Sequence, residues 1–271
     1  MRFKLALAGL MSVFALAIFP TAVFAGYTPA SRPTFQCITP TNCPGANYVV
    51  FNSFTNAPNY GDERAFFDAK DAAITSPGGY QDSVPVRDGE RVEMRVYVHN
   101  NANPNTIGAT AATAHNTTIL VLLPTGAART TQEAGAQITA SNANPNYVTD
   151  TVDLTAGTPF TVALDTSSPV MVTYRPNGVG DYVTNTLPNV TFSGTNSWTS
   201  NVGDWHGCFN YSAVITFTAI VHVPTTPTPP VTTTTKTLPN TGAGDILGIF
   251  AGASAVGTAG HYFVARRRRR S

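Results

Sequence analysis

Apolar and polar residues alternate with a period of two over most of residues 26–223, and this pattern constrains the fold more than any other feature of the chain. It is clearest where Val92, Met94 and Val96 fall on one face of an extended segment and the residues between them fall on the other. A period of two places successive side chains on opposite faces of a sheet, whereas a helix needs a period near 3.6. The sequence therefore predicts an all-β fold.

Several other segments have strand character and are separated by turn signals such as Asp88-Gly89. They are 48–54, 119–123, 136–140, 148–154, 160–164, 170–174 and 213–223. Short strands that are separated at regular intervals by turn residues predict an antiparallel immunoglobulin-like β-sandwich. It is either one elaborated sandwich or two small ones divided near Gly135. Residues 61–71 are the one stretch where we expect a helical turn or two.

Charge is unevenly distributed, although the chain of 271 residues has a net charge of only +1. The N-terminus carries Arg2 and Lys4, and five arginines occupy 266–270. Residues 26–241 hold seven Arg and two Lys against fourteen Asp and Glu, which is a net charge of 9 − 14 = −5. A nucleic-acid-binding protein needs the opposite sign on its body, so that class is excluded.

The first 25 residues have the pattern of a secretory signal peptide. A basic start is followed by a 15-residue apolar run over 5–19, and small residues precede the expected signal peptidase site at Ala25. The run is short for a bilayer core of about 30 Å, which favours cleavage over an uncleaved N-terminal anchor.

At the other end, the pentapeptide Leu238-Pro239-Asn240-Thr241-Gly242 precedes a mostly apolar stretch at 246–265 and then the arginine block. Twenty residues of helix measure about 30 Å, one bilayer core. The arginines would stay cytoplasmic under the positive-inside rule. In this order the three features resemble the LPxTG-type sorting signal of sortase-anchored bacterial cell-wall proteins.

That resemblance implies a covalent attachment through Thr241. A membrane sortase would attack the Thr241 carbonyl with a cysteine thiolate and break the bond to Gly242, and an amine of a peptidoglycan precursor would then resolve the acyl-enzyme. Pro239 restricts the backbone to an extended, kinked form, and Gly242 leaves the carbonyl unobstructed. A permanent single-pass anchor through 246–265 is the alternative.

Between the body and this signal, residues 224–237 contain four Pro and eight Thr. Such a segment cannot bury a core and is typical of a polyproline-like stalk. At about 3.1 Å per residue it spans roughly 43 Å.

The body itself resembles uncharacterised secreted immunoglobulin-like modules of Saccharibacteria and actinobacteria. The resemblance rests on a strand ending in an Asn-rich turn, 92–103, and a second ending in Leu-Pro-x-Gly, 117–126, with short matches at 32–35, 51–53, 61–64 and 207–209. It implies a secreted location and a β-sandwich, and no chemistry.

Three cysteines suit an exported chain. Cys37 and Cys43 lie close together in a Pro-containing loop, which favours a local disulfide, and Cys208 is the alternative partner of either. No spacing matches a zinc site.

The sequence contains no recognisable catalytic motif, and we expect no enzyme activity and no cofactor. Asp204, His206 and Cys208 at alternate positions are a weak candidate for a metal or nucleophile site. An acidic group that could hold Ca²⁺ consists of Asp62, Glu63, Asp68 and Asp71, although a solvated charged face fits it better.

Four aromatic residues gather in sequence before the last expected strand: Trp198, Trp205, Phe209 and Tyr211. They predict either an end-plug of the sandwich core or an exposed platform for a sugar or protein ligand.

These observations predict a secreted, cell-wall-anchored surface protein that displays a β-sandwich for adhesion or surface structure, with a host glycan or protein as ligand. One alternative is a sortase-assembled pilin subunit, which needs a lysine nucleophile on the body, and Lys70 is the one there. The other is a wall-anchored glycan hydrolase, which needs paired carboxylates.

Overall fold

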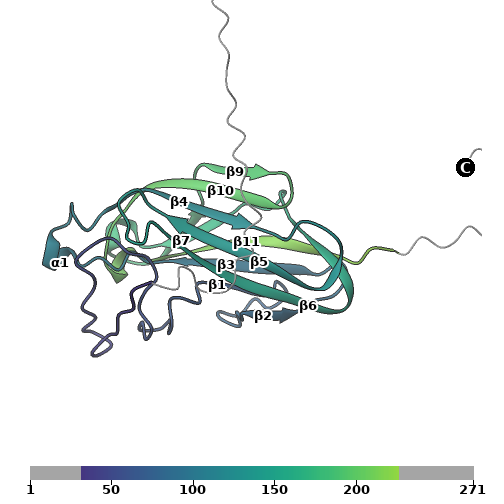
Figure 1. Ribbon diagram of the computed structural model, residues 1–271, viewed down its shortest axis with the longest axis horizontal. Helices are drawn as coiled ribbons and strands as arrows, with labels where there is room; N and C mark the ends of the chain where they lie inside the picture. The colour runs from purple at the N-terminus through teal and green to yellow at the C-terminus, as the bar shows by residue number, and fades with distance from the viewer. Residues whose placement is uncertain (1–31, 226–271) are drawn as a thin grey trace, which may run out of the picture. The chain divides into compact units, whose positions relative to one another are not determined.

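The computed structural model describes residues 32–225, which form one compact unit made mostly of antiparallel β-strands (Figure 1). The signal peptide, the sorting pentapeptide, the apolar stretch 246–265 and nearly all of the stalk lie outside the described residues. Within the described residues, no helix is long and apolar enough to cross a membrane. The prediction of an all-β fold is confirmed.

Eleven strands form one hydrogen-bonded network, with eight along a single path and three branching from it, and strand β6 divides the network into two sheets. The first contains β1 (Phe67–Asp71), β3 (Arg91–Val98), β11 (Ala213–His222), β7 (Met171–Tyr174) and β8 (Val183–Thr186). The second contains β2 (Ser83–Pro85), β6 (Tyr147–Leu164), β5 (Arg129–Thr139), β4 (Ala114–Leu122), β10 (Ser197–Trp205) and β9 (Val190–Ser193). All pairs are antiparallel except β2 with β6.

Strand β11 is the centre of the first sheet. One edge pairs with β3 along most of its length, from Ala213 to Ile220. The other edge is shared, because β7 pairs with its first four residues and the end of β6 pairs with its last four.

Strand β6 is a single strand of 18 residues, whereas the sequence predicted two strands at 148–154 and 160–164. Its first part pairs with β5 in the second sheet, and residues 161–164 pair with β11 in the first sheet. The exposed residues Gly157, Thr158 and Pro159 lie at the crossing, which explains why the sequence suggests a break there.

The two sheets enclose one hydrophobic core. The alternation in β3 is confirmed, because Val92, Met94 and Val96 are fully buried, and the edge of the Trp198 ring in β10 meets Phe217 of β11 with centroids 5.4 Å apart. Gly135 pairs with neighbours on both sides inside β5, so residues 32–225 have no division there.

Two segments differ from the prediction. Residues 49–54 are buried and Tyr48 is half-buried, but the segment makes isolated bridges and no strand, because its backbone groups bond to residues 99–101, to Phe35 and to side chains such as that of Asn101. The helical turn expected within 61–71 is wrong, since β1 begins at Phe67 and pairs with β3. The described helices are short: α1 (Pro104–Ile107), η1 (Pro176–Gly178) and η2 (Phe209–Tyr211).

Candidate functional site

A cavity of about 780 Å³ lies at the end of the sandwich where β11 begins. Residues that are far apart in the sequence line it, from the segments 40–45, 58–60, 101–105, 173–182 and 208–214 together with Phe54, Arg95, Tyr97 and His99. Its volume lies within the range of small-molecule sites. It is therefore the best candidate for a functional site among the described residues.

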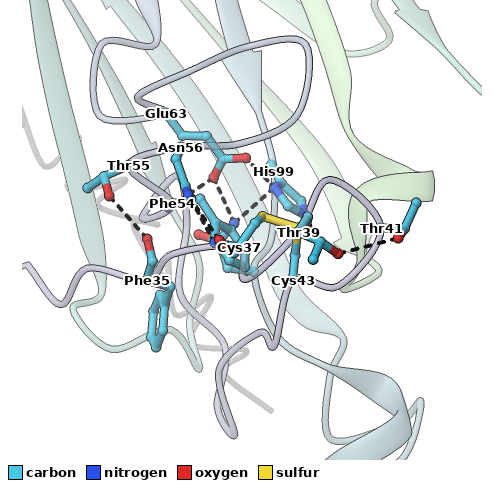
Figure 2. The surroundings of a disulfide bond; sticks show 11 residues. Phe35, Cys37, Thr39, Thr41, Cys43, Phe54, Thr55, Asn56, Glu63 and His99 are labelled. Atoms are coloured by element: carbon cyan, nitrogen blue, oxygen red, sulfur yellow. Dashed lines mark hydrogen bonds and ion pairs between the residues drawn. A yellow bond between two sulfur atoms is a disulfide. The ribbon is translucent and has the colours of Figure 1, made fainter.

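The disulfide loop forms one rim of this cavity. Cys37 is bonded to Cys43, the first of the two pairings considered, and Cys208 is a free thiol. Asn56 holds the loop, because its amide accepts from the Cys37 N–H at 2.7 Å and donates to the Cys37 carbonyl at 3.0 Å (Figure 2).

A buried polar network lies beneath the cavity, which His99 and Asn101 line and Glu63 does not. Glu63 and His99 are 0% and 1% exposed, and 2.6 Å separates His99 Nδ1 from Glu63 Oε1 (Figure 2). The Glu63 carboxylate also accepts from Asn101 Nδ2 at 2.8 Å and from the Phe54 N–H at 3.3 Å. Three neighbouring groups thus contact the buried carboxylate and hold it in place, as buried polar groups require.

Aromatic rings pack around His99. The Phe209 ring lies 4.1 Å from the imidazole between centroids, and Phe54 stacks on it at 6.0 Å. Tyr60 and Tyr97 stack on each other at 4.0 Å beside this group. His99 Nε2 is buried and has no hydrogen-bond partner within residues 32–225.

Two arginines contribute positive charge to the cavity lining. Arg95 is paired with Asp68 at 2.6 Å and lies over the rings of Tyr60 and Tyr80, with 5.2 and 4.3 Å to the centroids. Arg175 lies 4.5 Å from the centroid of Tyr182, whose side chain is 54% exposed. No Asp or Glu is among the described residues that line the cavity.

A second cavity of about 220 Å³ shares Arg175 with the first. Its other lining residues are Tyr174, Asn177, Val202, Asp204, Trp205, His206 and Tyr211. The indole Nε1 of Trp205 is buried and has no acceptor within the described part of the chain.

The candidate site at Asp204, His206 and Cys208 is not formed. Asp204 pairs with His115 at 3.0 Å, His206 Nδ1 lies 3.0 Å from the Thr113 hydroxyl, and Cys208 lines the larger cavity. Alternate positions converge only within a regular strand, and β10 ends at Trp205 before His206.

The acidic residues do not gather into a calcium site either. Asp62 pairs with Arg64, Glu63 is buried beside His99, and Asp68 pairs with Arg95. Asp71 accepts from the Ala73 N–H in a local turn. Across residues 32–225, no group of three His, Cys, Asp or Glu is placed to hold a metal ion.

The four aromatic residues near the last strand separate in the fold. Trp198 is 1% exposed and belongs to the core. Trp205 and Tyr211 line the smaller cavity, and Phe209 covers His99 in the larger one. Of these four residues, Trp198 therefore fills the core and the other three form cavity walls.

Lys70 lies in β1 with its side chain only 7% exposed. Its ammonium group is 3.4 Å from Glu93 Oε1, lies over the ring of Tyr80, and donates to the Ser76 carbonyl. These contacts hide the group from an acyl-enzyme partner.

Two buried carboxyl groups lie at β1, one from Asp68 within the strand and one from Asp150 of β6 beside it. Burial raises the pKa of Asp150 to about 7, although its Oδ2 accepts from the Phe67 N–H at 2.8 Å. Burial also raises the pKa of Asp68 to about 6 despite the neighbouring Arg95 guanidinium.

Sequence reasoning missed the pairing of Glu63 with His99 and the cavity role of Arg175 and Tyr182. The sequence did contain one usable signal, because three consecutive polar residues, His99, Asn100 and Asn101, directly follow the alternating segment that forms β3. All three are buried in the structure.

No protein-family model, curated protein or solved structure matches this chain.

Proposed function

We propose that this chain is a secreted surface protein, coupled by a sortase through Thr241 to peptidoglycan, whose immunoglobulin-like sandwich binds a ligand in the cavity at its tip. The anchoring half of the proposal is supported by the order of features in 238–271. The binding half is supported by the position of the cavity.

That position is the observation that carries the proposal. Ala213, the first residue of β11, lines the cavity, and β11 then runs ten residues to His222. At about 3.4 Å per residue this is roughly 34 Å, so the described chain leaves the sandwich at the end opposite the cavity (Figure 1). A binding site far from the wall-proximal end is suited to display.

The alternatives are less well supported. A pilin subunit needs an accessible lysine, and Lys70 is buried and ion-paired. A glycan hydrolase needs two carboxyl groups facing a cleft, and the larger cavity has no lining carboxylate within the described residues.

The anchoring is tested by expressing Thr241→Ala in a sortase-bearing cell and measuring the protein in the wall fraction. We expect its release from the wall, because the acyl-enzyme forms on the Thr241 carbonyl. Asn240→Ala is the matched control, since the third position of the motif is variable. Wall attachment of Thr241→Ala equal to that of the unaltered chain would refute the anchoring.

The binding is tested by screening the full chain against glycans and extracellular-matrix proteins. Tyr182→Ala removes an exposed ring from the cavity wall and should abolish the binding found. Tyr147→Ala is the control, because Tyr147 is 40% exposed and lies outside the cavity lining. If both variants lose binding equally, or if neither loses it, the cavity is excluded as the binding site.

A further inference from the structure

Arg175 differs from three other arginines of the first sheet and its loops. Arg64, Arg91 and Arg95 each have a carboxylate oxygen 2.5–2.6 Å away. Arg175 has no carboxylate within 4 Å among the described residues, and its Nε is buried without an acceptor. A buried donor without an acceptor costs free energy unless a ligand supplies one.

The charge around Arg175 makes it a site for an anion. Residues 26–241 have a net charge of −5, yet the larger cavity is lined by two arginines and by no Asp or Glu within the described chain. Arg95 is already neutralised by Asp68, so Arg175 carries the unbalanced charge. A local positive site on a negative body attracts an anion and orients it.

The remaining polar groups of the cavity suit hydroxyls better than further charges. Four lining asparagines make no side-chain hydrogen bond within residues 32–225: Asn42, Asn59, Asn105 and Asn210. Each amide offers two donors and one acceptor, the complement of a vicinal pair of hydroxyl groups. The exposed ring of Tyr182 adds an apolar surface beside them.

We propose that the cavity binds a sugar that carries a carboxylate, such as a uronic or sialic acid, with Arg175 as the anchor of the carboxylate. The planar guanidinium matches a carboxylate with two parallel N–H···O bonds. Arg175 lines both cavities, but the carboxylate would lie in the larger one, because the smaller one contains the carboxylate of Asp204. This inference rests on the proposed binding function and names its ligand class.

The experiment measures binding of the full chain, in mild detergent, to immobilised oligosaccharides that end in glucuronic, galacturonic or sialic acid. Each probe is paired with its carboxyl-reduced, neutral counterpart. The variant is Arg175→Gln, and Arg129→Gln is the control, since Arg129 is exposed and lies outside both cavities. Unchanged unfolding temperatures establish that the variants fold.

We expect the acidic probes to bind at least tenfold more tightly than the reduced ones, with the difference lost in Arg175→Gln and kept in Arg129→Gln. Equal binding of acidic and reduced probes would overturn the carboxylate assignment and leave the binding function standing. Binding of no sugar, with an acidic peptide or a matrix protein bound instead, would overturn the sugar class. Failure of every probe and protein to bind would overturn the proposed binding function itself.

Discussion

Replacing Glu63 by alanine should destabilise the sandwich far more than any change on its surface. The carboxylate is 0% exposed and holds the donors of His99, Asn101 and Phe54 at 2.6, 2.8 and 3.3 Å. Each buried donor left without a partner costs about 1–3 kcal/mol, and breaking a buried polar pair costs about 3–5 kcal/mol in total. For a unit of this size that lowers the unfolding temperature by about 6–20 °C.

The assay is urea unfolding of Glu63→Ala and of the unaltered chain, followed by tryptophan fluorescence. The adjacent Asp62→Ala is the matched control, because Asp62 makes a partly exposed pair with Arg64 that contributes at most about 1 kcal/mol. If the free energies of unfolding of Glu63→Ala and Asp62→Ala differ by less than about 1 kcal/mol, the network does not hold the loops against β3 and the reasoning is refuted.

Two further predictions concern the body. The folded state raises the pKa of Asp150 from 3.8 to about 7, so the protonated form of this carboxyl stabilises the fold. The free energy of unfolding should therefore fall as the pH rises from about 4 to about 7, by roughly 1.4 kcal/mol per pKa unit. Asp150→Asn, which keeps an acceptor for the Phe67 N–H, should flatten this dependence in urea titrations at pH 4.5 and 8, and an unchanged slope would contradict the assignment. Gly207→Ala should lower the unfolding temperature through a cost of about 1–3 kcal/mol, because a Cβ there would lie 2.4 Å from the Ala102 carbonyl oxygen. Gly157→Ala meets no atom within 4 Å and should leave that temperature nearly unchanged in the same thermal scan, so equal effects would refute the steric argument.

The strands were largely predictable because their signal is local. Alternation in β3 and β11 follows from one buried face, so a window of eight residues is enough to find it. Strand β6 was divided in two because its exposed middle looks like a turn, although the backbone stays extended while it passes between sheets. The segment 48–54 was taken for a strand because a buried irregular loop has the same apolar content.

The cavity was not predictable from such windows. The network beneath it joins Glu63 to His99 over 36 residues, and its walls come from loops and strands that are far apart in the sequence. The charge pattern gives a wrong expectation here. In the sequence Glu63 belongs to an acidic group, but in the structure its side chain is buried apart from the other members. Local reasoning did locate the aromatic residues, and three of the four line a cavity.

Strand β11 also determines how the unit would carry load. A pull on residue 225 against a ligand held in the loops at the other end is directed along β11. Its neighbours on both edges are bonded to it by hydrogen bonds perpendicular to the strand. The load is therefore applied to many bonds at once in shear, instead of opening them one after another. A body built this way resists tension best along the line from its cavity to its C-terminal end.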